Sequence, residues 1–263
     1  MSYKYGALVS IRNEQRWIKK CLTQISCTPV EVISITRGLT SWRNGYTELD
    51  NTTREIRDWQ VVHRAHPPEI LYQEVQAPES DEAQRNICLQ ALKDVGCDFV
   101  FIIDPDEFYH QQDLDTLFAF CDQHGPEKVG QVHIYAHSYW RGMRYRCGTE
   151  RFGPVMMRCD ADSKFHYIRD VCQDTQHTLD MFLHHMSAVH TDKEMEEKIK
   201  GWSHSHEVQD GWLERVWHGW KKDRRVTNLH PVSPGLWPCV KKVDRIEIPA
   251  ILHDHPLMKR DTL

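Results

Sequence analysis

Three acidic residues follow a strongly apolar segment in the first half of the chain. The segment Phe99–Ile103 is apolar throughout, and Asp104, Asp106 and Glu107 come directly after it. An apolar run rich in aromatic and β-branched residues predicts a strand buried on both faces. We expect Pro105 to keep the backbone extended, so that Asp104 and Asp106 lie on the same edge of the strand end. Two carboxylates at this spacing suit Mg²⁺ or Mn²⁺ bound together with a substrate phosphate.

The same acidic residues also suit a plain solvated turn, because Asp and Pro are common turn residues. Short motifs produce many false positives, so the metal-binding interpretation needs support from other residues. That support has to come from the elements that would place further polar side chains at the same edge.

The first 110 residues alternate between apolar and amphipathic segments. We expect strands at Tyr5–Ser10, Val30–Thr36, Glu69–Tyr72 and Phe99–Ile103. Helices are expected around Trp17–Ile25, from Thr52 or Thr53 onwards, and after an N-cap at Ser80. This alternation predicts an α/β fold with a parallel sheet.

Several polar residues lie where the predicted strands end. Glu14 follows the first strand, Asp50 is in the loop after the second, and Arg85 opens the helix before the acidic segment. Because the carboxyl ends of parallel strands meet at one edge, we expect these side chains near Asp104 and Asp106. Carboxylates can accept hydrogen bonds from a base or a ribose, while a metal ion and an arginine can neutralise a diphosphate. The sequence therefore predicts a nucleotide diphosphate site.

The second half of the chain is less regular. Strands are expected at Val129–Ala136 and Gly153–Arg158, and a capping box at Thr191–Glu194 predicts a helix. Trp202, Trp212, Trp217 and Trp220 could stack on sugar or base rings, but tryptophans at helical spacing more often form a core. The five prolines after residue 230 predict an extended tail. The aromatic and basic segment Tyr139–Arg146 suits either solvated surface or single-stranded DNA.

Composition indicates one globular domain without a membrane span. The chain has 263 residues and a net charge of −5, which argues against a nonspecific nucleic-acid coat. No apolar stretch approaches the roughly 20 residues of a transmembrane helix, and the first residues lack a signal peptide. Nine cysteines without a Cys-x-x-Cys pair indicate reduced thiols. We therefore expect a cytoplasmic protein.

Four segments of the chain resemble, in order, the motifs of GT-A fold, family-2-like glycosyltransferases. They are Leu8–Glu14, the loop from Trp42 to Thr53, Glu82–Asn86, and Ile102–Glu107 with its Asp-x-Asp motif. The resemblance covers roughly the first 110 residues. A weaker signature of a phage and bacterial subgroup comprises Leu183–Ser187, Lys198 with Trp202–His204, and Asn228–Pro231. One departure is that Thr36-Arg37-Gly38 lacks the first aspartate of the family's loop, so that only Asp50 remains.

The resemblance implies a fold, an activity and a cofactor. The fold would be a GT-A, Rossmann-like, mixed and mainly parallel sheet flanked by helices, with a mostly helical C-terminal part. Residues 1–263 would form a single catalytic domain, in which 1–110 bind the nucleotide sugar and 111–263 bind the acceptor. The activity would be hexosyl or pentosyl transfer from a nucleotide sugar, most simply a UDP-sugar, with Mn²⁺ or Mg²⁺. The acceptor would be a glycan, a protein or a modified phage DNA base.

The resemblance also assigns roles to individual residues. Asp106 would bind the metal directly, and Asp104 would bind the ribose, or the metal through water. The remaining donor-binding residues would be Arg12, Glu14, Asp50 and Arg85. A later histidine would complete the metal site, either His184 or His185, at what we expect to be a strand terminus, or else His253. For each histidine a packed or capped side chain is the alternative.

An inverting enzyme of this kind also needs a carboxylate base near the acceptor hydroxyl. Asp170 is the candidate, with Asp174 and Asp180 as competitors, and a retaining enzyme would need none. Two other functions stay open. A sugar nucleotidyltransferase would share the sheet and the acids, but it normally opens with a glycine-rich loop where this chain has Ser10–Glu14. A non-catalytic nucleotide-sugar-binding protein would share the fold alone.

Overall fold

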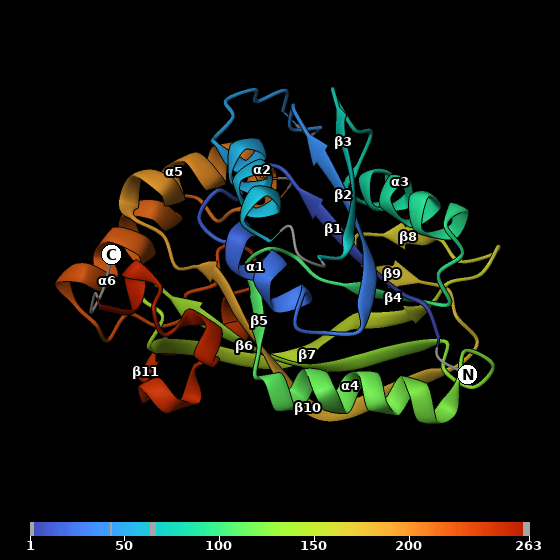
Figure 1. The fold of residues 1–263 in the computed structure, drawn as a ribbon. Coiled ribbons are helices and arrows are strands. Elements are labelled where there is room, and N and C mark those ends of the chain that lie inside the picture. The colour runs from blue at the N-terminus through green and yellow to red at the C-terminus, as the bar shows by residue number, and fades with distance from the viewer. Residues whose placement is uncertain (1–2, 43, 64–66, 203, 260–263) are drawn as a thin grey trace. The chain divides into compact units, whose positions relative to one another are not determined.

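A computed structural model describes residues 3–42, 44–63, 67–202 and 204–259, so Ser203 of the weaker signature lies outside the described residues. The chain divides into two compact units, whose elements are labelled in Figure 1. Unit 1 comprises Met1–Glu107, Gln111–Ile134 and Phe152–Met181. Unit 2 comprises Phe108–His110, Tyr135–Arg151 and Phe182–Leu263. These boundaries differ from the predicted halves, and the assignment of a single catalytic domain stays a prediction.

Unit 1 begins with the alternating strands and helices that the sequence predicts. The parallel strands are β1 (Tyr5–Ile11), β2 (Val30–Gly38), β3 (Glu69–Val75) and β4 (Phe99–Ile102). The helices between them are α1 (Ile18–Ile25), α2 (Thr52–Val62) and α3 (Asp81–Asp94). The Ser80 hydroxyl caps α3 by accepting a hydrogen bond from the Ala83 N–H at 3.1 Å. The expected α/β class is therefore confirmed.

The strands of the described residues form one large mixed sheet and one small sheet. The large sheet has the order β3-β2-β1-β4-β7-β6-β10-β5, and β11 pairs with β7. Its later strands are β5 (Glu107–Tyr109), β6 (Gln131–Trp140), β7 (Tyr145–Arg158), β10 (Gln176–Ala188) and β11 (Lys241–Lys242). The small sheet is the hairpin of β8 (Phe165–Tyr167) and β9 (Asp170–Val171). Helix α4 (Gln111–His124) had no predicted counterpart.

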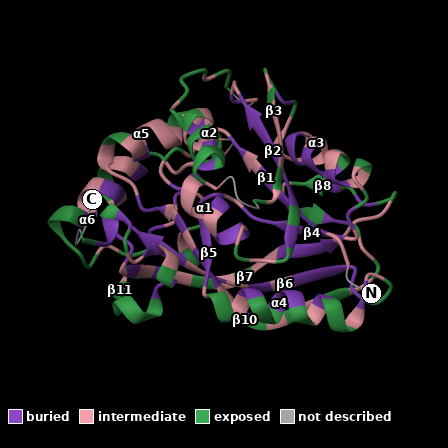
Figure 2. Ribbon diagram, viewed as in Figure 1, coloured by how far each residue is buried: buried purple, intermediate pink, exposed green. Residues whose placement is uncertain are grey.

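The core of unit 1 forms where α3 packs closely on the sheet. Leu8, Leu92, Val100 and Ile102 are fully buried in one cluster, and Figure 2 shows β4 buried along its length. Gly6 permits this approach, because a Cβ there would lie 2.7 Å from a Leu92 methyl carbon. This packing fixes the orientation of α3 on the sheet, and α3 carries Arg85.

Unit 2 has a separate core of tryptophans. The Trp140 ring lies 4.8 Å from the Trp217 ring, 5.9 Å from Trp212 and 6.4 Å from Trp220, measured between centroids. Trp212, Trp217 and Trp220 therefore lie in a core, as their helical spacing favoured, whereas Trp202 is only partly buried. Trp217 lies in the π-helix η2 (Leu213–His218) and Trp220 in α6 (Gly219–Lys222). The helical segments before them are α5 (Asp192–Gly201) and η1 (Ser205–Glu207).

Two predictions about unit 2 need correction. The segment Tyr139–Arg146 is not an exposed surface for nucleic acid, because Tyr139, Trp140 and Arg141 are fully buried. The proline-rich tail is not simply extended, because prolines also fit the first turn of a helix. The tail forms the short 3₁₀ segments η3 (Pro234–Leu236), η4 (Arg245–Glu247), η5 (Ala250–Leu252) and η6 (Pro256–Lys259).

The C-terminal part of the chain is mostly helical, as expected. After β10, the described elements are helical segments except for the two-residue strand β11. None of the helices formed by the described residues combines the length and the apolar character that crossing a bilayer requires.

Candidate active site

The acidic residues after β4 form a turn instead of an extended strand end. The Glu107 N–H donates to the Asp104 carbonyl at 3.0 Å, and the Asp104 N–H donates to Glu107 Oε2 at 3.0 Å. The prediction that Pro105 extends this backbone is therefore wrong. Proline presets the φ angle that the second residue of a turn requires, and the turn chemistry prevails here. The turn leads directly into β5.

Two arginines neutralise this acidic turn. Arg85 Nη2 lies 3.0 Å from both carboxylate oxygens of Asp104. Arg169 Nη2 lies 2.9 Å from Asp104 Oδ2 and 2.5 Å from Glu107 Oε1. Burial on its own raises the pKa of Asp104, but the charges of Arg169 and Arg85 outweigh it and hold that pKa well below its ordinary value. Asp104 is therefore ionised at neutral pH.

Glu107 responds to the same surroundings in the opposite direction. Its side chain is 0% exposed. Burial raises the pKa of Glu107 to about 8, opposed by Arg169 and assisted by the neighbouring charge of Asp104. The turn thus combines one ionised carboxylate and one carboxyl group of raised pKa against two guanidinium groups.

The β8–β9 hairpin positions Arg169. Asn86 on α3 holds the start of this hairpin, because its side chain donates to the Phe165 carbonyl and accepts from the Phe165 N–H, both at 2.9 Å. Ile168, at the tip, has a φ of 41°, a left-handed conformation that β-branched residues rarely adopt. The guanidinium of Arg169 then lies 4.7 Å from the centroid of the Phe152 ring. Sequence reasoning missed Arg169, whose only signal was its position next to the candidate base Asp170.

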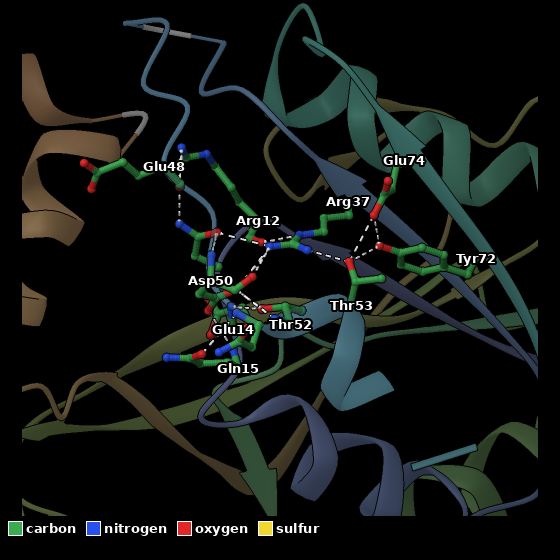
Figure 3. Close-up of polar contacts among 12 residues, drawn as sticks. Arg12, Glu14, Gln15, Arg37, Glu48, Asp50, Thr52, Thr53, Tyr72 and Glu74 are labelled. Carbon is green, nitrogen blue, oxygen red and sulfur yellow. Dashed lines mark hydrogen bonds and ion pairs between the residues drawn. The ribbon is translucent and has the colours of Figure 1, made fainter. Parts of the chain in front are cut away.

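A second polar cluster lies at the ends of β1 and β2, with Asp50 at its centre (Figure 3). Asp50 Oδ1 accepts from the Thr52 N–H at 2.9 Å and from Arg37 Nη2 at 3.1 Å. Asp50 Oδ2 accepts from the Gln15 N–H at 2.9 Å. The Thr52 hydroxyl also accepts from the Glu14 N–H at 2.7 Å. Asp50 therefore ties the loop after β2 to the end of β1.

Arg37 occupies the position where the family's first aspartate is missing. Its side chain is 4% exposed. Arg37 Nε donates to the Arg12 carbonyl at 2.9 Å, and Nη1 donates to the Thr53 hydroxyl (Figure 3). Arg12 in turn lies 4.9 Å from the centroid of the Tyr46 ring and donates to the Glu48 carbonyl at 3.2 Å. A buried cation therefore braces this edge of the sheet.

The predicted metal ligands are not gathered into a metal site within the described residues. Among residues 3–42, 44–63, 67–202 and 204–259, no three His, Cys, Asp or Glu side chains are grouped so that they could hold a metal ion. Both oxygens of Asp104 face guanidinium groups, and Asp106, in the same turn, is 7% exposed. This donor set does not fit the Mn²⁺ or Mg²⁺ that the resemblance implies.

The three candidate histidines belong to unit 2. His184 and His185 lie inside β10, which continues to Ala188, so the prediction that they end a strand is wrong. His184 is buried, with Nδ1 2.7 Å from the Tyr139 hydroxyl. His253 Nε2 lies 3.0 Å from the Arg245 carbonyl and 2.9 Å from the Ile248 carbonyl. His184 and His253 thus have the packed or capped arrangement of ordinary structural histidines.

The three candidate bases are exposed. Asp170 begins β9, Asp174 pairs with Arg158 at 3.2 Å, and Asp180 lies in β10. Of the three, only Asp170 directly follows Arg169, which pairs with Asp104 and Glu107 of the acidic turn. The choice of Asp170 as base stays a prediction.

No protein-family model matches the sequence, and no curated protein does. Solved structures share parts of the fold. Staphylococcus aureus TarS is 14% identical with a TM-score of 0.47, and the match covers 75% of this chain and 38% of TarS. The chain thus spans less than half the length of TarS.

Two further solved structures are similar. Glucosyl-3-phosphoglycerate synthase from Mycobacterium tuberculosis, in complex with Mn²⁺, UDP and glucosyl-3-phosphoglycerate, is 15% identical with a TM-score of 0.32, covering 54% of this chain and 46% of that one. UDP-glucose pyrophosphorylase complexed with UDP-glucose is 11% identical with a TM-score of 0.32. That match covers 60% of this chain and 70% of the pyrophosphorylase chain. The similarity is one of fold.

Proposed function

We propose that the chain is a glycosyltransferase that uses a nucleotide-sugar donor. The observation that supports this most is the placement of four predicted donor-binding residues in unit 1. Glu14, Asp50 and Asp104 follow β1, β2 and β4, and Arg85 of α3 pairs with Asp104. Open parallel sheets bind their ligands at this carboxyl edge. The four residues also lie in the segments that resemble the GT-A motifs.

In the proposed reaction, the acceptor hydroxyl oxygen attacks the anomeric carbon of the sugar. The bond from that carbon to the diphosphate oxygen breaks, and its electron pair stays on the departing nucleoside diphosphate. The hydroxyl proton passes to a carboxylate base in an inverting enzyme. Asp170 is suited to this role because it directly follows Arg169 in the chain. The Cα atoms of the two residues are therefore about 3.8 Å apart. We propose that the acceptor binds residues 111–263. We also propose that the reaction is cytoplasmic, because all nine cysteines are free thiols.

A donor screen tests the proposed function. UDP-, GDP- and CDP-sugars would be added separately to the full chain, with Mn²⁺ and with EDTA, and the melting temperature recorded. A ligand that binds only the folded protein stabilises it by about 2.7 kcal/mol at 100 times its Kd. We expect one nucleotide series to raise the melting temperature and its sugar nucleotide to release nucleoside diphosphate. Stabilisation by no member of the panel would contradict the proposal.

A second assay separates transfer from nucleotide-sugar synthesis. A sugar nucleotidyltransferase would release pyrophosphate from a nucleoside triphosphate and a sugar phosphate, whereas a glycosyltransferase would not. We expect no pyrophosphate release. A binding protein without activity would show the melting-temperature shift but no release of nucleoside diphosphate.

A further inference from the structure

Arg169 places a cation directly against the acidic turn. Its Nη2 lies between the carboxylates of Asp104 and Glu107, at 2.9 and 2.5 Å. Its side chain is 9% exposed, and its guanidinium packs over the Phe152 ring. A guanidinium held on two carboxylates and an aromatic face has little freedom to move away. The positive charge beside Asp104 is therefore built into the fold.

Arg85 offers hydrogen-bond donors at the same carboxylate. Its side chain is 8% exposed, and its Nη2 is used by Asp104. Its Nε and Nη1 atoms are buried and have no hydrogen-bond partner among the described residues. Buried donors in folded proteins are normally paired with a protein group or a bound molecule, so these two N–H groups can donate to a ligand. The Asp104 side chain is 26% exposed, so this cluster has a side open to solvent.

The chemistry of the ligand follows from these donors. Two guanidinium groups present planar forks that match the oxygens of a phosphate. Glu107 has a raised pKa of about 8, so it contributes less than a full negative charge at neutral pH. The cluster of Arg85, Arg169, Asp104 and Glu107 also keeps two Arg85 N–H donors that its own carboxylates do not use. It suits a diphosphate better than it suits a second cation.

We propose that Arg85 and Arg169 bind the diphosphate of the donor directly, in place of a divalent metal ion, and that Asp104 positions both guanidinium groups. The inference rests on the proposed function and names Arg169 as a further residue of its site. When the bond to the anomeric carbon breaks, its electron pair goes to the diphosphate oxygen. The fixed N–H donors of the two arginines stabilise the charge that develops there.

Calorimetric titration with inorganic pyrophosphate tests this inference without knowledge of the sugar or base. The full chain would be titrated in EDTA and, separately, with Mn²⁺. We expect pyrophosphate to bind in EDTA. Arg169→Gln should weaken this binding roughly tenfold or more, because a hydrogen bond to a charged group contributes about 1.5–3 kcal/mol. Arg169→Lys should fold and bind with intermediate affinity, since it keeps the charge but loses the fork.

Arg158→Gln is the matched control, because Arg158 also pairs with two aspartates of unit 1, Asp160 at 2.6 Å and Asp174 at 3.2 Å. It should bind pyrophosphate as the wild type does. Binding that requires Mn²⁺, binding that both Arg169 variants retain in full, or no binding at all would each overturn the inference. The wild-type titration in EDTA decides the metal question even if Arg169→Gln fails to fold.

Failure of the proposed diphosphate site and failure of the proposed glycosyltransferase function would give different results. Pyrophosphate binding in EDTA that depends on Arg169, without transfer from any nucleotide sugar, would uphold the diphosphate site and contradict the glycosyltransferase. Sugar transfer that needs Mn²⁺ and is indifferent to Arg169→Lys would uphold the glycosyltransferase and overturn the diphosphate site.

Discussion

The Asn86 side chain of α3 is hydrogen-bonded to both the N–H and the carbonyl of Phe165, at 2.9 Å each. It thereby attaches the β8–β9 hairpin to α3. Asn86→Ala should leave a buried N–H and carbonyl unpaired and cost about 2 kcal/mol of unfolding free energy. Pyrophosphate binding should also weaken, since the hairpin carries Arg169. Denaturation and calorimetry would measure the two effects.

His166→Ala is the control for this prediction, because His166 is exposed on the same hairpin. It should change neither stability nor pyrophosphate affinity. If Asn86→Ala binds pyrophosphate as tightly as the wild type, the hairpin does not need this clamp to place Arg169.

Asp50→Asn should destabilise unit 1 without removing a side chain's volume. Arg37 is buried, and the neutral amide would leave it without its counter-charge at the edge of the sheet. Breaking a buried ion pair from one side typically costs about 3 kcal/mol. Urea denaturation would measure the loss. Asp58→Asn, at an α2 side chain that is 50% exposed, should cost less than about 1 kcal/mol.

Trp140→Ala should destabilise the core of unit 2. The ring is fully buried and contacts the rings of Trp212, Trp217 and Trp220. Loss of a buried large aromatic side chain costs about 3–5 kcal/mol. Near-ultraviolet circular dichroism during denaturation would follow this cluster. Ile246→Ala, at a side chain 83% exposed, should stay within about 0.5 kcal/mol of the wild type.

Unit 2 should lose stability in acid because of two partly buried histidines. Burial, assisted by the charge of Arg146, lowers the pKa of His137 to about 4, and burial with nearby His185 and His204 lowers the pKa of His230 to about 4. Folding thus favours the neutral rings. Their contribution to stability is complete above the unfolded pKa of about 6.5 and is lost as the pH falls towards 4.

His137→Phe should flatten this acid dependence. The His137 ring stacks on Phe182 with centroids 4.4 Å apart, so a phenyl ring can take its place without becoming charged. The free energy of unfolding, measured in urea between pH 4.5 and 7, should fall less in the variant than in the wild type. Equal pH dependence in both proteins would show that His137 does not titrate with unfolding.

The regular elements of unit 1 could be predicted because their signals are local. Apolar runs mark β1, β2 and β4, and the Ser80 N-cap marks the start of α3. Glu14, Asp50 and Asp104 could be expected after the carboxyl ends of β1, β2 and β4 because parallel strands end together. These inferences needed only periodicity and chain direction.

The pairings within the site could not be predicted because they are not local. Arg169 reaches Asp104 from a short hairpin that has no periodic pattern, and Ile168 adopts a conformation that its residue type disfavours. The turn from Asp104 to Glu107 is stabilised by the Glu107 side chain, which accepts a hydrogen bond from the Asp104 N–H. This bond favours a turn over continued extension of the strand. The sequence shows Arg37 as a departure from the motif, but its contacts with Arg12, Thr53 and Asp50 exist only in the folded chain.

The pairing of Arg169 with Glu107 also constrains the order in which the protein forms during translation. Strands β1 to β4 and the turn leave the ribosome well before residue 169, and domains begin to fold in that order. Glu107, which is fully enclosed in the finished protein, has no arginine partner from the hairpin during that interval. Until the hairpin forms, water has to solvate the Glu107 carboxyl group in place of Arg169.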